Sequence, residues 1–450
     1  MIHQYKLMGE NIVIDSGSAS VHVVDEIAYD AIALLAEGCA REAVSAELKS
    51  RYSDLSDAEI AELFEDIDEL SSAGCLFAPD AALEVEDKPD AKRDIKALCL
   101  HIAHTCNLRC DYCFAGQGKY HGAAALMSLE TAKRAIDFLI EHSGTKYNLE
   151  VDFFGGEPLL AWETVKDTVR YARTLEAEHN KRFRFTLTTN GVLLDDEVTD
   201  FCNAEMDNVV LSLDGRREVH DARRKTPSGG GSYELIVPKF QRFAERREGG
   251  YYMRGTYTAL NCDFVSDILH IADLGFRELA MEPAVTAPGD PLGLADEHLP
   301  QLFAEYEHLA REMAERDGCG EGFTFYHYTL DLEGGPCVHK RVAGCGAGSE
   351  YFAVTPEGEL YPCHQVVGEP DFVAGDLENG VRDGFEFRRK AINERAECRD
   401  CWAKLYCSGG CAANAYHDSG DPDGVYELGC ELFKKRLECA IWLKCREISK

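Results

Sequence analysis

The sequence predicts an α/β protein with a central parallel sheet or barrel and a smaller domain on either side. Three observations lead to this prediction. Strand and helix patterns alternate between residues 97 and 320, which is typical of repeated βα units with right-handed crossovers. The first 80 residues have a separate pattern of short strands followed by helices, and residues 321–450 are rich in cysteine.

The composition limits the partners that we expect. The chain has 450 residues, a net charge of −33 and 19 cysteines. Nucleic acids and anionic membrane surfaces bind basic patches, so this acidity argues against both. The chain opens without an apolar signal segment, and no apolar run approaches the length of a membrane span. We therefore expect a cytoplasmic protein whose cysteines bind metal rather than form disulfides.

Residues 1–80 predict a small domain. Asn11–Ile14 and Ser20–Val24 have the pattern of short strands joined by a polar turn. Asp57–Leu70 has one apolar face at helical spacing, and Cys75–Phe77 is a candidate for a final short strand. An ordinary winged-helix-like domain, packed on the barrel or bound to DNA, would also fit, although the acidic charge disfavours DNA.

Residues 81–96 are polar and charged and predict a linker. The α/β region of 97–320 follows it. Its predicted strands are 97–102, 149–154, 183–188, 209–213, 251–257 and 278–281. Ser128 can cap a helix after the first strand, and Leu299–Glu315 has a helical pattern after the last. Chemistry in such folds takes place at the carboxyl ends of the strands.

Three cysteines follow the first predicted strand. Cys106, Cys110 and Cys113 have the spacing Cys-X3-Cys-X2-Cys on one short loop. Three thiolates can hold three irons of a four-iron cluster and leave the fourth iron open to a small chelating molecule. The alternative is a zinc site completed by His101 or His104.

Glycine and polar residues follow the next three predicted strands. They are Gly155, Gly156 and Glu157, then Thr188 and Asn190, and then Ser212 and Asp214. Glycine lets the polar end of a ligand approach the backbone, and Glu157 offers a carboxylate. The arginines Arg223 and Arg224 come next in the chain. Each of these motifs is weak alone, but their order at successive strand ends predicts one binding site.

A second group of cysteines lies between residues 337 and 430. Its members are Cys345, Cys363, Cys398, Cys401, Cys407, Cys411 and Cys430, with Cys337 as a candidate eighth. Segments 351–354 and 359–361 predict a hairpin that places Cys345 and Cys363 at one end. Eight thiolates would serve either two four-iron clusters or two tetrahedral zinc sites.

These motifs together resemble the radical S-adenosylmethionine (SAM) superfamily, and the downstream cysteines match the SPASM domain of its peptide maturases. The resemblance implies a partial (β/α)6 TIM-type barrel, with SAM on the open iron of the cluster held by Cys106, Cys110 and Cys113. It implies that Gly155–Pro158 contacts the SAM amino group. The ribose and methionine moiety would lie against Thr188, Asn190, Ser212 and Asp214. Arg224 would meet the SAM carboxylate, with Arg223 as the neighbouring alternative.

The same resemblance implies two auxiliary clusters, and so three [4Fe-4S] clusters in total. One would be held by Cys345, Cys363 and Cys411, with Cys337 as an eighth ligand. The other would be held by Cys398, Cys401, Cys407 and Cys430. If Cys337 is not a ligand, one auxiliary iron is open to a substrate thiolate.

Residues 1–80 resemble the PqqD-like domains that bind the leader of a precursor peptide along a strand edge. Several further stretches, among them Tyr361–Gln365 and Cys407–Asn414, resemble the SCIFF (six-cysteines-in-forty-five) peptide maturases. The implied activity is thioether formation in a small cysteine-rich precursor peptide by a 5′-deoxyadenosyl radical, with flavodoxin or ferredoxin as electron donor. An anaerobic sulfatase maturase, which makes formylglycine, and a non-catalytic peptide-binding iron–sulfur module are the alternatives.

Overall fold

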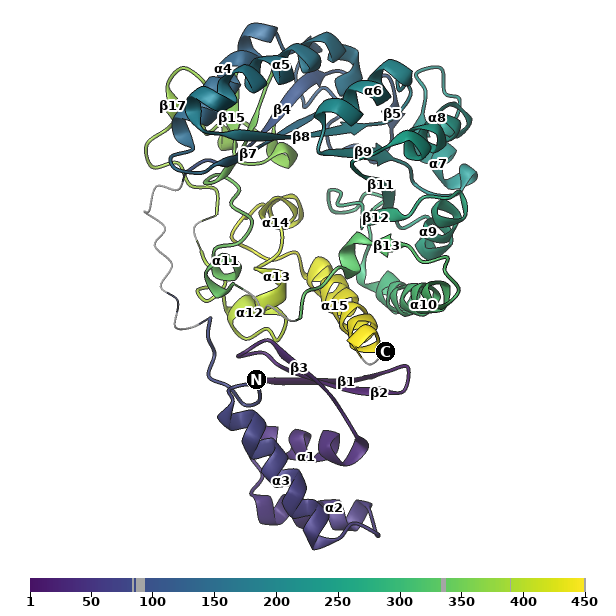
Figure 1. Ribbon diagram of the computed structural model, residues 1–450, viewed down its shortest axis with the longest axis vertical. Coiled ribbons are helices and arrows are strands. Elements are labelled where there is room, and N and C mark those ends of the chain that lie inside the picture. Colours follow the sequence, from purple (N-terminus) through teal and green to yellow (C-terminus); the bar gives the residue numbers. More distant parts are fainter. Residues whose placement is uncertain (83–84, 86–93, 333–336, 389, 449–450) are drawn as a thin grey trace.

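The computed structural model describes residues 1–82, 85, 94–332, 337–388 and 390–448. Most of the predicted linker 81–96, and residues 333–336 before Cys337, lie outside these ranges. In Figure 1 a curved sheet with helices around its outside occupies one end of the long axis, and the N-terminal elements occupy the other. Helix α15 (Glu427–Ile448) lies between the two.

The N-terminal elements form a three-stranded antiparallel sheet and three helices. The strands are β1 (Ile2–Leu7), β2 (Glu10–Asp15) and β3 (Ser20–Val24), in that order. The helices are α1 (Glu26–Ala36), α2 (Arg41–Arg51) and α3 (Asp57–Ser72). Ser56 and Glu59 close a capping box at the start of α3. Strand β1 was not predicted, and the strand predicted over Cys75–Phe77 was wrong, because these residues form a bend.

The six strands predicted for the α/β region are confirmed. They are β4 (Ala97–His104), β7 (Asn148–Gly155), β8 (Arg182–Thr189), β9 (Asn208–Ser212), β11 (Gly250–Tyr257) and β12 (Glu278–Pro283). Neighbours pair in parallel in the order β4-β7-β8-β9-β11-β12. All eight residues of β4 are buried, as expected for a strand covered on both faces. The strands therefore end at one common edge.

Helices cover the outside of this sheet (Figure 1). They are α4 (Leu129–His142), α5 (Trp162–His179), α6 (Asp196–Glu205), α8 (Tyr233–Arg246), α9 (Phe264–Asp273) and α10 (Leu299–Gly318). The Ser128 hydroxyl caps α4 by accepting a hydrogen bond from the Thr131 N–H at 3.0 Å, as predicted. Within the described ranges, no helix is both long and apolar enough to span a bilayer.

The C-terminal hairpin continues the same sheet. Strands β14 (Tyr351–Val354) and β15 (Glu359–Tyr361) have the predicted bounds. Strand β14 also pairs in parallel with β4, with Tyr351 opposite Ala97. The hairpin is extended by β16 (Gly375–Asp376) and β17 (Gly380–Val381). The cysteines that flank the hairpin are therefore positioned by the barrel sheet itself.

The N-terminal sheet packs against the C-terminal region. The His3 ring stacks on Trp402 with ring centroids 3.8 Å apart, and His3 also forms an ion pair with Glu438. The Tyr406 hydroxyl donates a hydrogen bond to the Ala19 carbonyl at 2.5 Å. These contacts place the three-stranded sheet beside the loop that carries Cys401 and Cys407.

Candidate functional site

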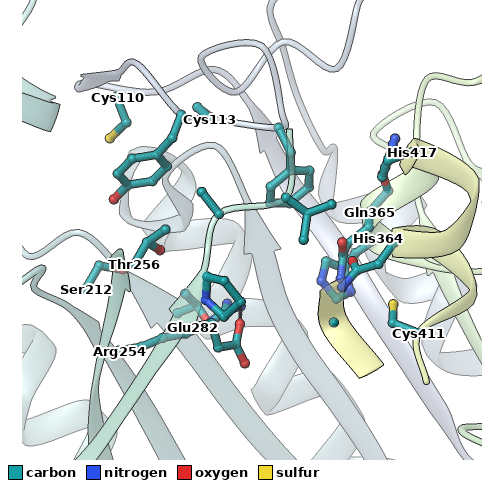
Figure 2. A pocket seen from close by; sticks show the side chains of 18 of the residues that line it. Cys110, Cys113, Ser212, Arg254, Thr256, Glu282, His364, Gln365, Cys411 and His417 are labelled. Carbon is teal, nitrogen blue, oxygen red and sulfur yellow. Dashed lines mark hydrogen bonds and ion pairs between the residues drawn. The ribbon is translucent and has the colours of Figure 1, made fainter. Parts of the chain in front are cut away.

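One cavity of about 480 Å³ lies at the carboxyl ends of the barrel strands. Figure 2 shows Cys110 and Cys113 on one side of it and Cys411 on another. Ser212 and Thr256 lie on the strands β9 and β11. The predicted site residues that line it are Cys106, Cys110, Cys113, Gly155, Gly156, Glu157, Thr188, Asn190, Ser212, Arg224, Cys407, Cys411 and Cys430. Those not among its lining residues are Asp214, Cys337, Cys345, Cys363, Cys398 and Cys401.

The cysteine loop lies directly against the end of β7, because the contact is formed by glycines, which have no side chains. A Cβ added to Gly156 would lie 2.1 Å from the Thr105 carbonyl oxygen. A Cβ on Gly118, whose φ is +84°, would lie 2.8 Å from Gly156 Cα and 3.0 Å from the Cys106 Cβ. Only glycine permits such a close approach of the two backbones. Gly156 after β7 and Gly118 on the loop are therefore both needed to hold the loop in this position.

The loop thiols lie in a desolvated environment. Burial raises the pKa of the Cys106 thiol to about 11 and that of Cys110 to about 12. Without a metal these groups are protonated at neutral pH, so iron binding would displace their protons. Such thiols fit a cluster that neutralises several of them together.

The zinc alternative finds less support. His101 and His104 are both buried and lie 3.2 Å apart, Nδ1 to Nε2. Their rings pack against Tyr120 rather than completing a set of thiolate ligands.

Glu157 joins the ends of two strands. Its fully buried carboxylate accepts hydrogen bonds from the Asn190 N–H and the Thr189 hydroxyl, both at 2.8 Å. It also accepts one from the Leu159 N–H at 3.0 Å. Burial raises the pKa of Glu157 to about 6, although these hydrogen bonds favour the carboxylate. The same group therefore borders the cavity and fixes β7 to the loop after β8.

Asp214 and Arg224 form a buried pair behind the cysteine loop. The Arg224 Nε donates to Asp214 Oδ2 at 3.0 Å, and the Tyr112 hydroxyl donates to the same oxygen at 2.5 Å. The other carboxylate oxygen, Oδ1, accepts from the Thr256 N–H. Arg224 faces the cavity, whereas Arg223 forms an ion pair with Asp111 on the loop. Of the two arginines, Arg224 is thus the one placed to meet a ligand.

The downstream cysteines gather in two groups. Burial raises the pKa of Cys363 to about 12, and the neighbouring Cys411 and Cys345 raise it as well. Burial likewise raises the pKa of Cys430 to about 12, with further contributions from three nearby thiols. These belong to Cys407, Cys398 and Cys401. These neighbours are the ones that the SPASM resemblance gives to Cys363 and Cys430, and the two ligand sets stay a prediction. Cys337 is an exposed residue just before α11 (Val338–Ala343).

A group of polar residues deeper in the cavity was not predicted from the sequence. Arg254 on β11 and Glu282 on β12 form an ion pair at 2.6 Å, which Figure 2 shows below Ser212 and Thr256. His327 and Arg436 line the same cavity. Charged residues inside strands that are otherwise apolar could have revealed Arg254 and Glu282. Nothing in the local sequence indicates Arg436, because its position depends on how α15 packs.

Comparisons with known proteins agree with this geometry. Residues 100–253 match the family model of the Radical SAM superfamily. The chain is 24% identical over 368 residues to the cysteine-type anaerobic sulfatase-maturating enzyme of Clostridium novyi, covering 77% of this chain and 95% of that protein. It is 27% identical over 360 residues to the mycofactocin maturase MftC of Mycolicibacterium smegmatis, covering 75% and 85%.

Two solved structures share the fold. anSMEcpe with bound AdoMet and the Cp18Cys peptide has a TM-score of 0.64 at 20% identity, covering 79% of this chain and 99% of that one. Streptococcus suis SuiB bound to precursor peptide SuiA has a TM-score of 0.53 at 14% identity, covering 92% and 95%. The strand topology and these matches confirm the mixed α/β fold of a partial TIM-type barrel. Residues 100–253 of this chain thus match the Radical SAM superfamily, and the relatives that the chain resembles over most of its length include a sulfatase-maturating enzyme and a mycofactocin maturase.

Proposed function

We propose that this protein is a radical SAM oxidoreductase that forms thioether cross-links from cysteines of a ribosomally made, cysteine-rich precursor peptide. One observation carries the proposal: a single cavity is lined by the loop cysteines Cys106, Cys110 and Cys113 and by the downstream cysteines Cys407, Cys411 and Cys430. A peptide residue in this cavity would face both groups at once.

The residues of the barrel fit a four-iron cluster with SAM, because three partly buried cysteines share one loop and glycines let this loop lie directly against the strand end. Bound there, the cluster and SAM would supply a 5′-deoxyadenosyl radical that removes a hydrogen atom from the peptide. In this proposal the Arg224 guanidinium holds the SAM carboxylate, and Glu157 and Asn190 hold polar groups at the strand ends, since all three line the cavity. The walls of the cavity limit access of water to the reacting atoms.

The downstream cysteines would hold two auxiliary clusters, grouped as described above, with Cys337 as the candidate eighth ligand. Their place beside the cavity suits a role in binding a peptide thiolate and accepting the surplus electron. We further propose that an electron donor such as flavodoxin or ferredoxin reduces the protein in the cytoplasm.

We propose that residues 1–80 bind the leader of the precursor peptide. Within the described part of this sheet, β3 pairs on one side only, with β2. An extended peptide could add to the free edge by backbone hydrogen bonds. Because this sheet packs beside Trp402 and Tyr406, a bound leader would raise the local concentration of the core peptide near the cavity.

The main alternative is formylglycine formation, since a sulfatase-maturating enzyme is among the similar proteins. The two activities give different products. We would incubate anaerobically reconstituted protein with SAM, a reductant and a cysteine-rich candidate precursor, and then measure the peptide mass. Thioether formation removes about two hydrogens per cross-link and leaves fewer alkylatable cysteines. Formylglycine formation removes the sulfur instead.

Cys110→Ala is the test variant, and Cys319→Ala, at an exposed cysteine just after α10, is its matched control. We expect Cys110→Ala to bind peptide and to form neither product nor 5′-deoxyadenosine, while Cys319→Ala behaves as wild type. Wild-type protein with full iron that forms neither would contradict the enzymatic proposal and favour a binding module.

A further inference from the structure

We propose that the deep wall of the cavity, formed by Arg254, Glu282, His327 and Arg436, binds a carboxylate of the peptide residue that the enzyme modifies. We call these four residues the cationic wall. The inference rests on the proposed function, because it names the chemical class of the substrate residue in the same cavity.

Arg436 is the first observation behind this inference. It projects from α15 into the cavity, and its Nε is buried without a hydrogen-bond partner. Among the described residues, its guanidinium has no ion pair or hydrogen bond, and it lies over the Phe433 ring with the centroid 5.9 Å away. A desolvated guanidinium is costly unless an anion pairs with it.

The charges of the cationic wall do not balance. Arg254 is paired with Glu282 at 2.6 Å. Burial would raise the pKa of Glu282, but Arg254, His327 and Arg436 hold it at about 2, so the carboxylate is ionised. Burial lowers the pKa of His327 to about 4, so this ring is neutral at pH 7. Two guanidinium groups thus face one carboxylate, and one positive charge is uncompensated.

His327 supplies a further free donor or acceptor. Its Nε2 is buried without a hydrogen-bond partner and lies 3.9 Å from Glu282 Oε1. Two unsatisfied polar groups on adjacent parts of one wall indicate that a ligand completes the site. A carboxylate suits it best, because planar guanidinium groups bind carboxylates through paired hydrogen bonds.

The position of the wall identifies which part of the substrate it would meet. Arg254 lies near Arg224, whose charge influences its pKa, and Arg224 borders the end of the cavity that holds the cysteine loop. Cys430 and Arg436 both line this cavity from α15. A residue held by the wall would therefore share one cavity with both groups of cysteines, which is where the reacting residue must lie.

Carboxylates of two sources would fit, an acidic side chain and a peptide C-terminus. We would measure binding to the anaerobically reconstituted full-length protein with SAM by calorimetry. The probes are N-acetyl-aspartate N-methylamide and N-acetylalanine, each beside its neutral counterpart, N-acetyl-asparagine N-methylamide and N-acetylalanine amide. We expect at least one acid to bind about tenfold more tightly than its amide, as one charge-assisted pair would give. The acid that is preferred identifies the source.

Arg436→Met keeps the aliphatic stem and should reduce this preference to about twofold or less. Arg436→Lys should keep part of it, because the charge remains without the planar fork. Arg446→Met, at an exposed arginine further along α15, is the matched control and should bind as wild type. Equal binding of acids and amides, or a preference that survives Arg436→Met in folded protein, would overturn the proposal.

Two further measurements distinguish a failure of this inference from a failure of the proposed function. If Arg436 instead compensates the charge of a neighbouring cluster, Arg436→Met would shift the reduction potential and leave the carboxylate preference intact, which would also overturn the inference. Formation of 5′-deoxyadenosine without any probe tests the proposed function separately. A protein that prefers carboxylates but never cleaves SAM would contradict the proposed function and not the site.

Discussion

The Tyr112 hydroxyl donates a hydrogen bond to Oδ2 of Asp214 at 2.5 Å, and through it the cysteine loop is tied to the end of β9. The same oxygen accepts from Arg224 Nε. Asp214 is fully buried, and its carboxylate accepts hydrogen bonds from these two side chains and from the Thr256 N–H. The sequence analysis predicted Asp214 as a SAM contact. That contact stays a prediction, and the hydrogen bonds of Asp214 show that it also positions Tyr112 and Arg224.

This arrangement predicts that Asp214→Asn weakens the site indirectly. The change keeps an acceptor for the Thr256 N–H but leaves the buried Arg224 guanidinium without its counter-charge. We expect a loss of about 3 kcal/mol in the free energy of unfolding and weaker SAM binding. Tyr112→Phe removes one hydrogen bond and should cost about 1 kcal/mol. Chemical denaturation and calorimetry would check both, and equal effects of the two changes would contradict the assigned role of the Arg224 pair.

The close approach of Gly156 to the loop predicts the effect of one added methyl group. In Gly156→Ala the new Cβ would collide with the Thr105 carbonyl oxygen at 2.1 Å, so the loop must move away from β7. We expect the iron content after anaerobic reconstitution to fall by about half or more, because the three thiols lose their common geometry. Gly318→Ala is the control, since nothing lies within 4 Å of its Cβ position. Full iron content in Gly156→Ala would show that the loop does not depend on this contact.

The parts of the fold that could be predicted are those whose own residues carry a hydrophobic periodicity and turn signals. The six barrel strands and the 351–361 hairpin carry their own periodicity and turn residues, and all were found. Strand β1 was missed because its side chains are only half-buried, and their cover comes from Trp402 and Glu438, far away in the chain. The parallel pairing of β14 with β4 has no local signature either.

The site residues likewise divide into those with a local sequence signature and those that depend on the packing of distant elements. The cysteine spacings and strand-end motifs predicted most of the residues that line the cavity. Asp214 as a SAM contact stays a prediction. It follows β9 as Ser212 does, but its side chain is fully buried and is not among those that line the cavity. Arg436 was missed because only the packing of α15 against the barrel brings it to the cavity.

The stacking of His3 on Trp402 predicts how the N-terminal sheet is held. Trp402→Ala removes the stacked ring and should loosen β1 from the C-terminal region. We expect amide hydrogen exchange in β1 to rise by about tenfold, because a stacked aromatic pair and its buried area contribute on the order of 1 kcal/mol. Exchange in β8 should not change. Tyr326→Ala, at a ring that is 64% exposed, is the control. Uniform loss of protection in both strands would mean that Trp402 supports the whole fold instead.

Asp152 predicts a pH-dependent stability. It lies on β7 opposite Thr186 of β8, and burial together with Glu150 raises its pKa to about 6. The folded protein therefore binds this proton more tightly than the unfolded chain, in which an aspartate has a pKa of about 3.9. The stabilisation is present below about pH 4 and is lost as the pH rises through about 6. Asp152→Asn cannot ionise, so its melting temperature should exceed that of wild type at about pH 8, and this advantage should shrink toward about pH 5. Exposed Asp54→Asn should show no such trend, and a constant difference for Asp152→Asn across this range would show that its carboxyl is not protonated in the folded state.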